Sequence, residues 1–249
     1  MKASQKPKIS VVMAVYNGMP LGSQSETRTA SSAYLKDAIQ SILDQSYKDF
    51  EFIIINDAST DGTANYLKSL SDKRIKIIIN EKNLGLALSL NIGLKAAKGD
   101  YVARMDADDI SLPQRFEKQI NFFKAHEDYI LVGSQVMWMD KNNNVISGFD
   151  VPLKDEDIRK KLIARNQFHH ATVMFRRYDI EKLGAYRNNL NGVEDYDLWF
   201  RVIKKGKVAN LPERLVKRRI HEKALTQKNH FKTELLALKV RIMNLATLK

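Results

Sequence analysis

Four short apolar segments in the first half of the chain constrain its fold most strongly. Each has the length of a β-strand, and polar turns and amphipathic segments of helical length separate them; they cover residues 9–16, 50–55, 75–79 and 101–105. Near-continuous apolar runs are typical of parallel strands that are covered on both faces. Strands that alternate with helices in this way predict an α/β fold of Rossmann-like type, with a mostly parallel central sheet flanked by helices.

The regular alternation ends after residue 126, and shorter, mixed elements follow. A strand pair is expected at residues 130–139 and 142–147, joined by an asparagine-rich turn. Further strands are predicted at residues 171–175, 207–211 and 215–220. We therefore expect a smaller mixed sheet in this half. The last element, residues 229–248, has the pattern of a basic amphipathic helix that packs on the domain, on a partner or at a membrane interface.

Composition narrows the classes of function. The chain has no cysteine, which excludes disulfides, thiolate metal sites and cysteine nucleophiles and fits a reducing cytosol. It has neither a signal-peptide pattern nor a long apolar run, so a cytoplasmic location is expected. The net charge of +12 indicates an anionic partner: a nucleic acid, an anionic lipid surface or a phosphorylated substrate.

Acidic residues follow two of the predicted strands. Asp57 comes after the second strand, and Asp106, Asp108 and Asp109 come after the fourth. In open α/β sheets, ligands bind beyond the carboxyl ends of the strands. Mg²⁺ and Mn²⁺ typically take one or two carboxylates and complete their coordination with water and phosphate oxygens. The Asp-x-Asp spacing therefore predicts a divalent metal site that holds a phosphorylated ligand.

A structural role is the alternative for these acids. Asp108, Asp109 or Ser111 has the chemistry to cap a helix that begins near Pro113. Asp57 likewise lies in a turn of residues that commonly end strands and begin helices. The local pattern leaves both roles open.

A second acidic pair, Glu194 and Asp195, begins a predicted helix that also carries Tyr196 and Trp199. The helix dipole favours acids at this position. Alternatively, a carboxylate held beside aromatic side chains forms part of a pocket wall and serves as a general base. His221 follows the last predicted strand, where it is either a structural residue or a metal ligand.

Taken in order, these motifs resemble the family 2 inverting glycosyltransferases of the GT-A fold. The resemblance spans roughly residues 8–221. It is carried by residues 10–17, the strand that ends in residues 56–62, the segments 83–85 and 91–93 with their asparagine and glycine residues, the segment 105–109 with its three aspartates, and the Glu194-Asp195 helix start.

The resemblance implies roles for individual residues. Asp106 would lie near the ribose, Asp108 on the metal bound to the donor diphosphate, and Asp195 would be the catalytic base. The residues of the nucleotide-sugar site would be Ala14, Val15, Tyr16, Asp57, Asn83, Asp106 and Ala107. The metal, Mn²⁺ or Mg²⁺, would be held by Asp108, Asp106 and His221. The acceptor would contact Glu194, Trp199 and His170.

The resemblance also implies an activity. It is a metal-dependent, inverting transfer from a nucleoside-diphosphate sugar, with UDP favoured, to a hydroxyl of a saccharide or lipid-linked saccharide in surface polysaccharide synthesis. Residues 1–110 would bind the donor, residues 111–225 the acceptor, and residues 226–249 would form the terminal helix. The basic charge suits peripheral contact with the inner face of the plasma membrane. The oligomeric state is left open, with a homodimer as one alternative.

The sequence departs from the family pattern at three places, and two rival functions are possible. Ala14 stands where many members have proline, Asn56 where they have an acid, and residues 18–33 look like an insertion that is either a substrate lid or merely slack. A related nucleotidyltransferase would need a glycine-rich phosphate loop after the first strand, which is absent from the sequence. A nucleic-acid-binding module fits poorly because acids gathered at strand ends repel phosphates, so no nucleic acid partner is expected.

Overall fold

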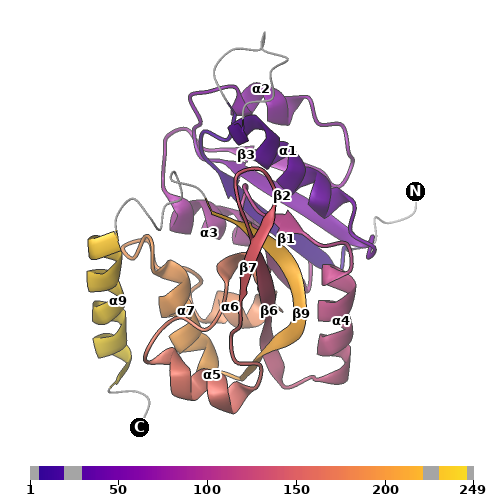
Figure 1. Cartoon of the computed structure of the whole chain (residues 1–249). Coiled ribbons are helices and arrows are strands. Elements are labelled where there is room, and N and C mark those ends of the chain that lie inside the picture. Colours follow the sequence, from indigo (N-terminus) through magenta and orange to yellow (C-terminus); the bar gives the residue numbers. More distant parts are fainter. Residues whose placement is uncertain (1–5, 20–29, 221–229, 246–249) are drawn as a thin grey trace.

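The computed structural model describes residues 6–19, 30–220 and 230–245 of the chain (Figure 1). Within this part, one nine-stranded sheet runs through the whole molecule, in the order β3-β2-β1-β4-β8-β6-β9-β5, and β7 pairs with β6. The predicted α/β fold is confirmed. The mixed strands, however, continue the parallel sheet and do not form a separate one.

The first four strands are parallel, as predicted. They are β1 (Ile9–Val15), β2 (Phe50–Asn56), β3 (Ile75–Ile79) and β4 (Tyr101–Arg104). Val15 lies opposite Asn56, and Val12 lies opposite Arg104. This register brings the carboxyl ends of β1, β2 and β4 to one edge of the sheet, so the polar residues that follow them are neighbours.

The second half begins where β4 pairs with an antiparallel strand, β8 (Met174–Arg176). The remaining strands are β5 (Ile110–Ser111), β6 (Tyr129–Met139), β7 (Val145–Phe149) and β9 (Lys207–Arg219). Two expectations were wrong here. Residues 171–175 are not one strand, because they begin in the 3₁₀-helix η1 (His170–Thr172). Residues 207–220 are not two strands, because β9 continues past Pro212 through a shift in its register with β6, between the Ser134–Leu211 and Gln135–Arg214 pairs.

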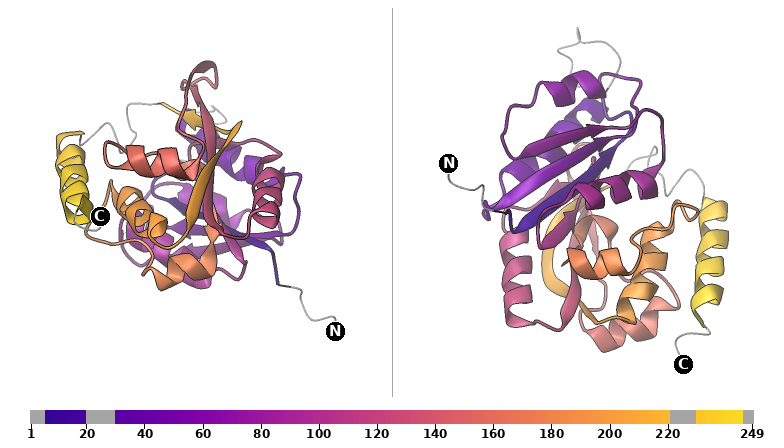
Figure 2. Two further views of the ribbon diagram at one scale, coloured as in Figure 1. Left: turned by 90° about the horizontal axis from the view of Figure 1, so that it is seen from below. Right: turned by 180° about the vertical axis from the view of Figure 1, so that it is seen from behind.

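Helices cover both faces of the sheet (Figures 1 and 2). On one face, apolar side chains of α1 (Ala30–Leu43), α2 (Thr63–Lys68) and α4 (Arg115–Ala125) join a buried core. On the other face, a second core includes α3 (Leu86–Ala96), α5 (Asp155–Leu162), α6 (Arg177–Lys182), α7 (Glu194–Ile203) and α9 (His230–Leu245). The outermost of these, α9, packs against α7 (Figure 1). None of the described helices is both long and apolar enough to cross a membrane.

Gly93 lets α3 pack closely against the sheet. A Cβ atom added there would lie 2.5 Å from Cγ1 of Val12 and 2.7 Å from Cδ1 of Ile55. Distances below about 3 Å require the neighbours to move, and these neighbours are buried core side chains. The close contact fixes α3, and with it the preceding residues 80–85, beside the carboxyl ends of β1 and β2.

Candidate active site

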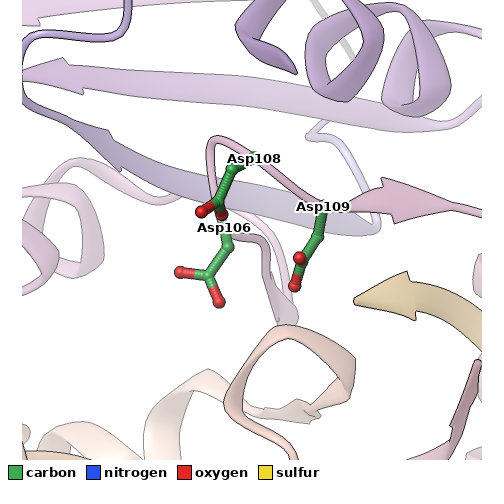
Figure 3. Close-up of side chains that lie close together, drawn as sticks. All are labelled: Asp106, Asp108 and Asp109. Atoms are coloured by element: carbon green, nitrogen blue, oxygen red, sulfur yellow. The ribbon is translucent and has the colours of Figure 1, made fainter. Parts of the chain in front are cut away.

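Three carboxylates lie together on the loop that follows β4. We call residues 106–109 the aspartate loop. In Figure 3 the side chains of Asp106, Asp108 and Asp109 point to the same side of this loop, and their ligand atoms lie within 4.8 Å of one another. The proposal that they merely cap a helix is contradicted, because α4 begins at Arg115 and its N-cap residue makes no side-chain cap.

Asp109 is the most buried of the three, with 2 % of its surface exposed. Its Oδ1 accepts a hydrogen bond of 2.8 Å from the backbone N–H of Arg219, whereas its buried Oδ2 has no hydrogen-bond partner among the described residues. Burial raises the pKa of this carboxyl well above its usual range, and the charges of Asp108 and Asp106 add to the effect. A cation would relieve this repulsion, and carboxylate oxygens are the ligands that Mg²⁺ and Mn²⁺ prefer. The residues therefore fit a divalent ion.

Arg104, the last residue of β4, was not foreseen as part of the site. It is 3 % exposed, and its Nη1 forms an ion pair with Oδ2 of Asp106. Burial opposes its charged form, but the Asp106 carboxylate outweighs this effect and raises the pKa of the guanidinium. Arg104 therefore keeps its positive charge although it is buried, and that charge is neutralised locally by Asp106. A lone arginine at the end of an apolar run was the available sequence signal.

The second acidic pair lies at the start of α7. Asp195 is half-buried; its Oδ1 accepts a hydrogen bond of 2.6 Å from the backbone N–H of Tyr196, and its Oδ2 accepts one of 2.8 Å from Nδ2 of Asn166. Burial raises the pKa of Asp195, and both hydrogen bonds oppose the rise. Burial, followed by the charge of Asp195, raises the pKa of Glu194 to about 7. Asn166 was not predicted to take part.

The aspartate loop and the start of α7 belong to one site. The charge of Arg104 lowers the pKa of both Glu194 and Asp195, and the charge of Asp106 raises that of Asp195. These influences require the groups to lie close together, because interactions between charges fall with distance. Tertiary structure thus brings the predicted metal ligands within electrostatic reach of the predicted base, and the charge of the buried Arg104 acts on both.

The predicted nucleotide residues lie at the carboxyl edge of the sheet. Asp57 is buried; its Oδ1 accepts hydrogen bonds of 2.8 Å from the backbone N–H of Leu84 and from Nδ2 of Asn80, and its Oδ2 accepts one of 2.9 Å from the N–H of Gly85. Nδ2 of Asn83 donates to the Asp57 carbonyl over 3.4 Å. Asp57 therefore ties residues 80–85 to the end of β2. Among the described residues, Oδ2 accepts this one hydrogen bond, from Gly85, so its second lone pair has the capacity to accept one from a ligand.

The other predicted nucleotide residues differ in exposure. Val15 is buried, Ala14 and Ala107 are half-buried, and Tyr16 is 51 % exposed. The Tyr16 ring is thus available to a ligand at the end of β1, whereas only the backbone of Val15 is suited to such a contact.

Two of the predicted acceptor residues, His170 and Trp199, pack against each other and are not exposed on the surface. Nε2 of His170 lies 2.8 Å from the Tyr186 hydroxyl, and the His170 ring packs edge-on against Trp199. Burial, followed by the charge of Arg104, lowers the pKa of His170 well below its usual range, so the ring is neutral. Trp199 is fully buried, which excludes direct contact with an acceptor in this conformation. Glu194 is also buried, at 3 % exposed.

Two predictions lie outside the described residues. His221, the third predicted metal ligand, follows the last described residue of its segment. The predicted lid at residues 18–33 falls mainly on residues 20–29, which are also outside them.

Comparison with known proteins bears on this arrangement. The sequence model described as glycosyl transferase family 2 matches residues 10–184. A putative glycosyltransferase of Bacillus subtilis, EpsE, is 37 % identical over 217 residues, which cover 85 % of this chain and 72 % of EpsE. The O-antigen biosynthesis glycosyltransferase WbnJ of Escherichia coli is 36 % identical over 227 residues, which cover 89 % and 82 % of the two chains.

Other relatives are longer than this chain. An uncharacterised glycosyltransferase of Haemophilus influenzae is 36 % identical over 227 residues, which cover 86 % of this chain and 66 % of the relative. The chain thus spans about two thirds of that relative's length.

Solved structures share the fold. Staphylococcus aureus TarS 1–349 in complex with UDP-GlcNAc superposes with a TM-score of 0.72 at 16 % identity, covering 95 % of this chain and 67 % of TarS 1–349. The mannosyltransferase PcManGT of Pyrobaculum calidifontis, in complex with GDP-Man and Mn²⁺, has a TM-score of 0.62 at 16 % identity, covering 89 % and 59 % of the two chains. At these identities the likeness establishes the architecture alone.

Proposed function

Because the chain belongs to glycosyltransferase family 2, we propose that it transfers a sugar from a nucleoside-diphosphate sugar to a hydroxyl group of a saccharide or lipid-linked saccharide. The observation that carries the proposal is that Asp195 feels the charges of both Asp106 in the aspartate loop and Arg104, which is paired with Asp106. The aspartate loop would bind the donor diphosphate through a cation, and the Glu194–Asp195 pair would face the acceptor hydroxyl.

Asp108 and Asp106 would hold Mn²⁺ or Mg²⁺, with Asp109 as a further oxygen donor. When bound, the ion supplies positive charge to the departing nucleoside diphosphate. The Mn²⁺ and GDP-Man bound to PcManGT support this assignment by analogy of fold. Asp106 also carries the Arg104 ion pair, so its remaining oxygen is the one free to face the donor.

Asp195 is proposed as the general base. As the acceptor oxygen forms its bond to the anomeric carbon, the hydroxyl proton moves to a carboxylate oxygen of Asp195, and the bond to the diphosphate breaks. This single displacement inverts the anomeric centre and needs no covalent nucleophile. Burial makes Asp195 a stronger base than a solvated aspartate, and the bonds from Asn166 and Tyr196 hold its orientation.

Residues 1–110 are proposed to bind the nucleotide, with UDP favoured, and residues 111–225 to bind the acceptor. The UDP-GlcNAc complex of TarS supports a uridine nucleotide by analogy. Residues 80–85, held by Asp57, and the exposed ring of Tyr16 would border the base and ribose.

A role in surface polysaccharide synthesis is proposed from the relatives, which include the O-antigen biosynthesis enzyme WbnJ. A lipid-linked acceptor would lie at the inner face of the plasma membrane, and the net charge of +12 favours peripheral contact with anionic lipid there. The nucleotidyltransferase and nucleic-acid hypotheses gain no support from the site.

Calorimetry with UDP tests the proposal, with GDP and deoxythymidine diphosphate as nucleotide controls. We expect wild-type protein to bind UDP with Mn²⁺ and more weakly without it. Asp108→Ala should abolish the metal-dependent part, whereas Asp128→Ala, which removes an exposed carboxylate paired with Lys207, should not change it. Failure of wild-type protein to bind any of the three nucleotides with Mn²⁺ would contradict the proposed function.

A further inference from the structure

Arg219, the last residue of β9, contacts three separate segments: the aspartate loop, the turn between β6 and β7, and α1. It is 3 % exposed. Its backbone N–H donates to Oδ1 of Asp109 over 2.8 Å, and its Nε donates to the carbonyl of Asp108 over 2.9 Å. Its Nη1 donates to the carbonyl of Asp140 over 3.3 Å and to Oδ1 of Asn143. One residue thus holds two consecutive residues of the loop.

These two contacts, with Asp108 and Asp109, constrain the direction of the Asp108 carboxylate, which is a proposed metal ligand. One hydrogen bond fixes the carbonyl of Asp108 and the other fixes the side chain of Asp109, so the peptide between them has little freedom. Three carboxylates within 4.8 Å of one another would otherwise move apart by mutual repulsion. Arg219 opposes this movement through hydrogen bonds to the loop itself.

The other end of the guanidinium is anchored to a support built from two more segments. Its Cζ lies 3.9 Å from the centroid of the Tyr34 ring, in the first part of α1. The Tyr34 hydroxyl donates to the carbonyl of Lys141 over 3.1 Å, in the turn between β6 and β7. Asn143 of the same turn donates to Asp37 of α1 over 3.5 Å. The turn and α1 are therefore attached to each other as well as to Arg219.

We propose that Arg219 is a positioning residue that sets the geometry of Asp108 for metal-dependent binding of the donor diphosphate. The proposal rests on the proposed function and assigns Arg219 no contact with the metal or the sugar. It acts through the residues it holds, as the outer hydrogen-bond partners of metal ligands do in other proteins.

Electrostatics and positioning predict opposite results for this residue. Removing a positive charge beside carboxylates should strengthen the binding of a cation, because one repulsive charge is lost. Loss of positioning should weaken it, because the carboxylates are no longer held in the binding geometry. The sign of the change in metal affinity therefore distinguishes the two effects.

Arg214 provides a matched control on the same strand. Its Nη1 donates to the carbonyl of Val136 over 2.7 Å, and its Nη2 donates to Asp150 over 2.5 Å. It thus also links β9 to β6 and to the segment after β7, but it has no recorded contact with the aspartate loop. Replacing either arginine removes a positive charge and contacts to neighbouring backbone.

The test titrates Mn²⁺ calorimetrically into wild type, Arg219→Gln, Arg219→Lys and Arg214→Gln, each without UDP and then with saturating UDP, at a temperature where circular dichroism shows each to be folded; the change in Mn²⁺ affinity is the deciding quantity. We expect Arg219→Gln to weaken binding by about tenfold or more. Arg219→Lys keeps the charge but loses the planar fork of donors, so it should weaken binding less. Arg214→Gln should stay within about twofold of wild type.

The outcomes separate failure of the positioning role from failure of the proposed function. Unchanged or tighter binding by Arg219→Gln would overturn the positioning role while leaving the proposed function intact. If Arg219→Gln does not fold, Arg219→Lys takes its place, and binding by this variant equal to wild type overturns the proposal. Absence of binding by wild type would instead contradict the proposed function, and the positioning role with it.

Discussion

The side-chain amide of Asn166 donates a hydrogen bond of 2.8 Å to Oδ2 of Asp195, the proposed base. The other oxygen of Asp195 is held by the backbone N–H of Tyr196. Each oxygen has two lone pairs, so each keeps capacity to accept an acceptor proton while its orientation is fixed. Asn166 precedes η1 and Asp195 lies in the first turn of α7, so this relationship exists only in the folded chain.

Asp195→Asn should abolish transfer while leaving donor binding intact. The amide cannot accept the proton, and general-base catalysis contributes about 10² to 10⁴-fold to rates. We expect kcat to fall by about this factor and the UDP affinity with Mn²⁺ to stay near that of wild type, measured by turnover and by calorimetry. Full activity in this variant would exclude Asp195 as the base.

Asn166→Ala should shift the pH dependence of the reaction. The hydrogen bond from Asn166 lowers the pKa of Asp195, so its loss should raise that pKa further. Because the base must be ionised, the rising limb of kcat/KM against pH should move to higher pH, by about one unit. A reduced rate with an unmoved limb would show that Asn166 only orients the group.

Glu194→Gln should stabilise the protein at alkaline pH. Burial raises the pKa of Glu194 in the folded state to about 7, from a value of 4.5 for the solvated group. The folded state therefore binds more protons between these values, and ionised Glu194 destabilises it fully only above pH 7. At pH 8 the variant should exceed wild type in the free energy of unfolding by about 3 kcal/mol, with little difference near pH 4.5.

Urea unfolding at the two pH values measures this effect, and Glu213→Gln is the control. Lys118 pairs with Glu213 and lowers its pKa, so removing its charge should bring no gain at pH 8. A Glu194→Gln variant that is less stable than wild type at pH 8 would contradict the prediction.

The Arg104–Asp106 ion pair should respond unequally to loss of either partner. Asp106→Ala leaves a buried guanidinium without its carboxylate, which typically costs about 3 to 5 kcal/mol. Arg104→Met leaves Asp106, whose side chain is 34 % exposed and can be hydrated, so its cost should be smaller. The double variant should be more stable than Asp106→Ala alone, because no buried charge remains. Equal losses in the two single variants, measured by denaturant unfolding, would contradict this account.

Local pattern was sufficient to predict the parallel half of the sheet and the position of its ligand edge. Burial on both faces requires continuous apolar runs, and strand ends require polar turns, so β1 to β4 and the acids that follow β4 can be recognised without tertiary information. The same reasoning failed at β9, because whether this strand continues past Pro212 depends on a shift in its register with β6, a partner that is distant in sequence.

Residue patterns along the chain are sufficient to establish the α/β architecture and the acidic character of the strand ends. Packing of the folded chain establishes which groups meet: Arg104 is buried against Asp106, Asn166 donates to Asp195, and Arg219 donates to the aspartate loop. Helix and strand patterns arise from neighbouring residues, whereas burial of a charge and pairing between distant segments depend on crossovers and register. Those are properties of the packed sheet and leave no periodic trace in the chain.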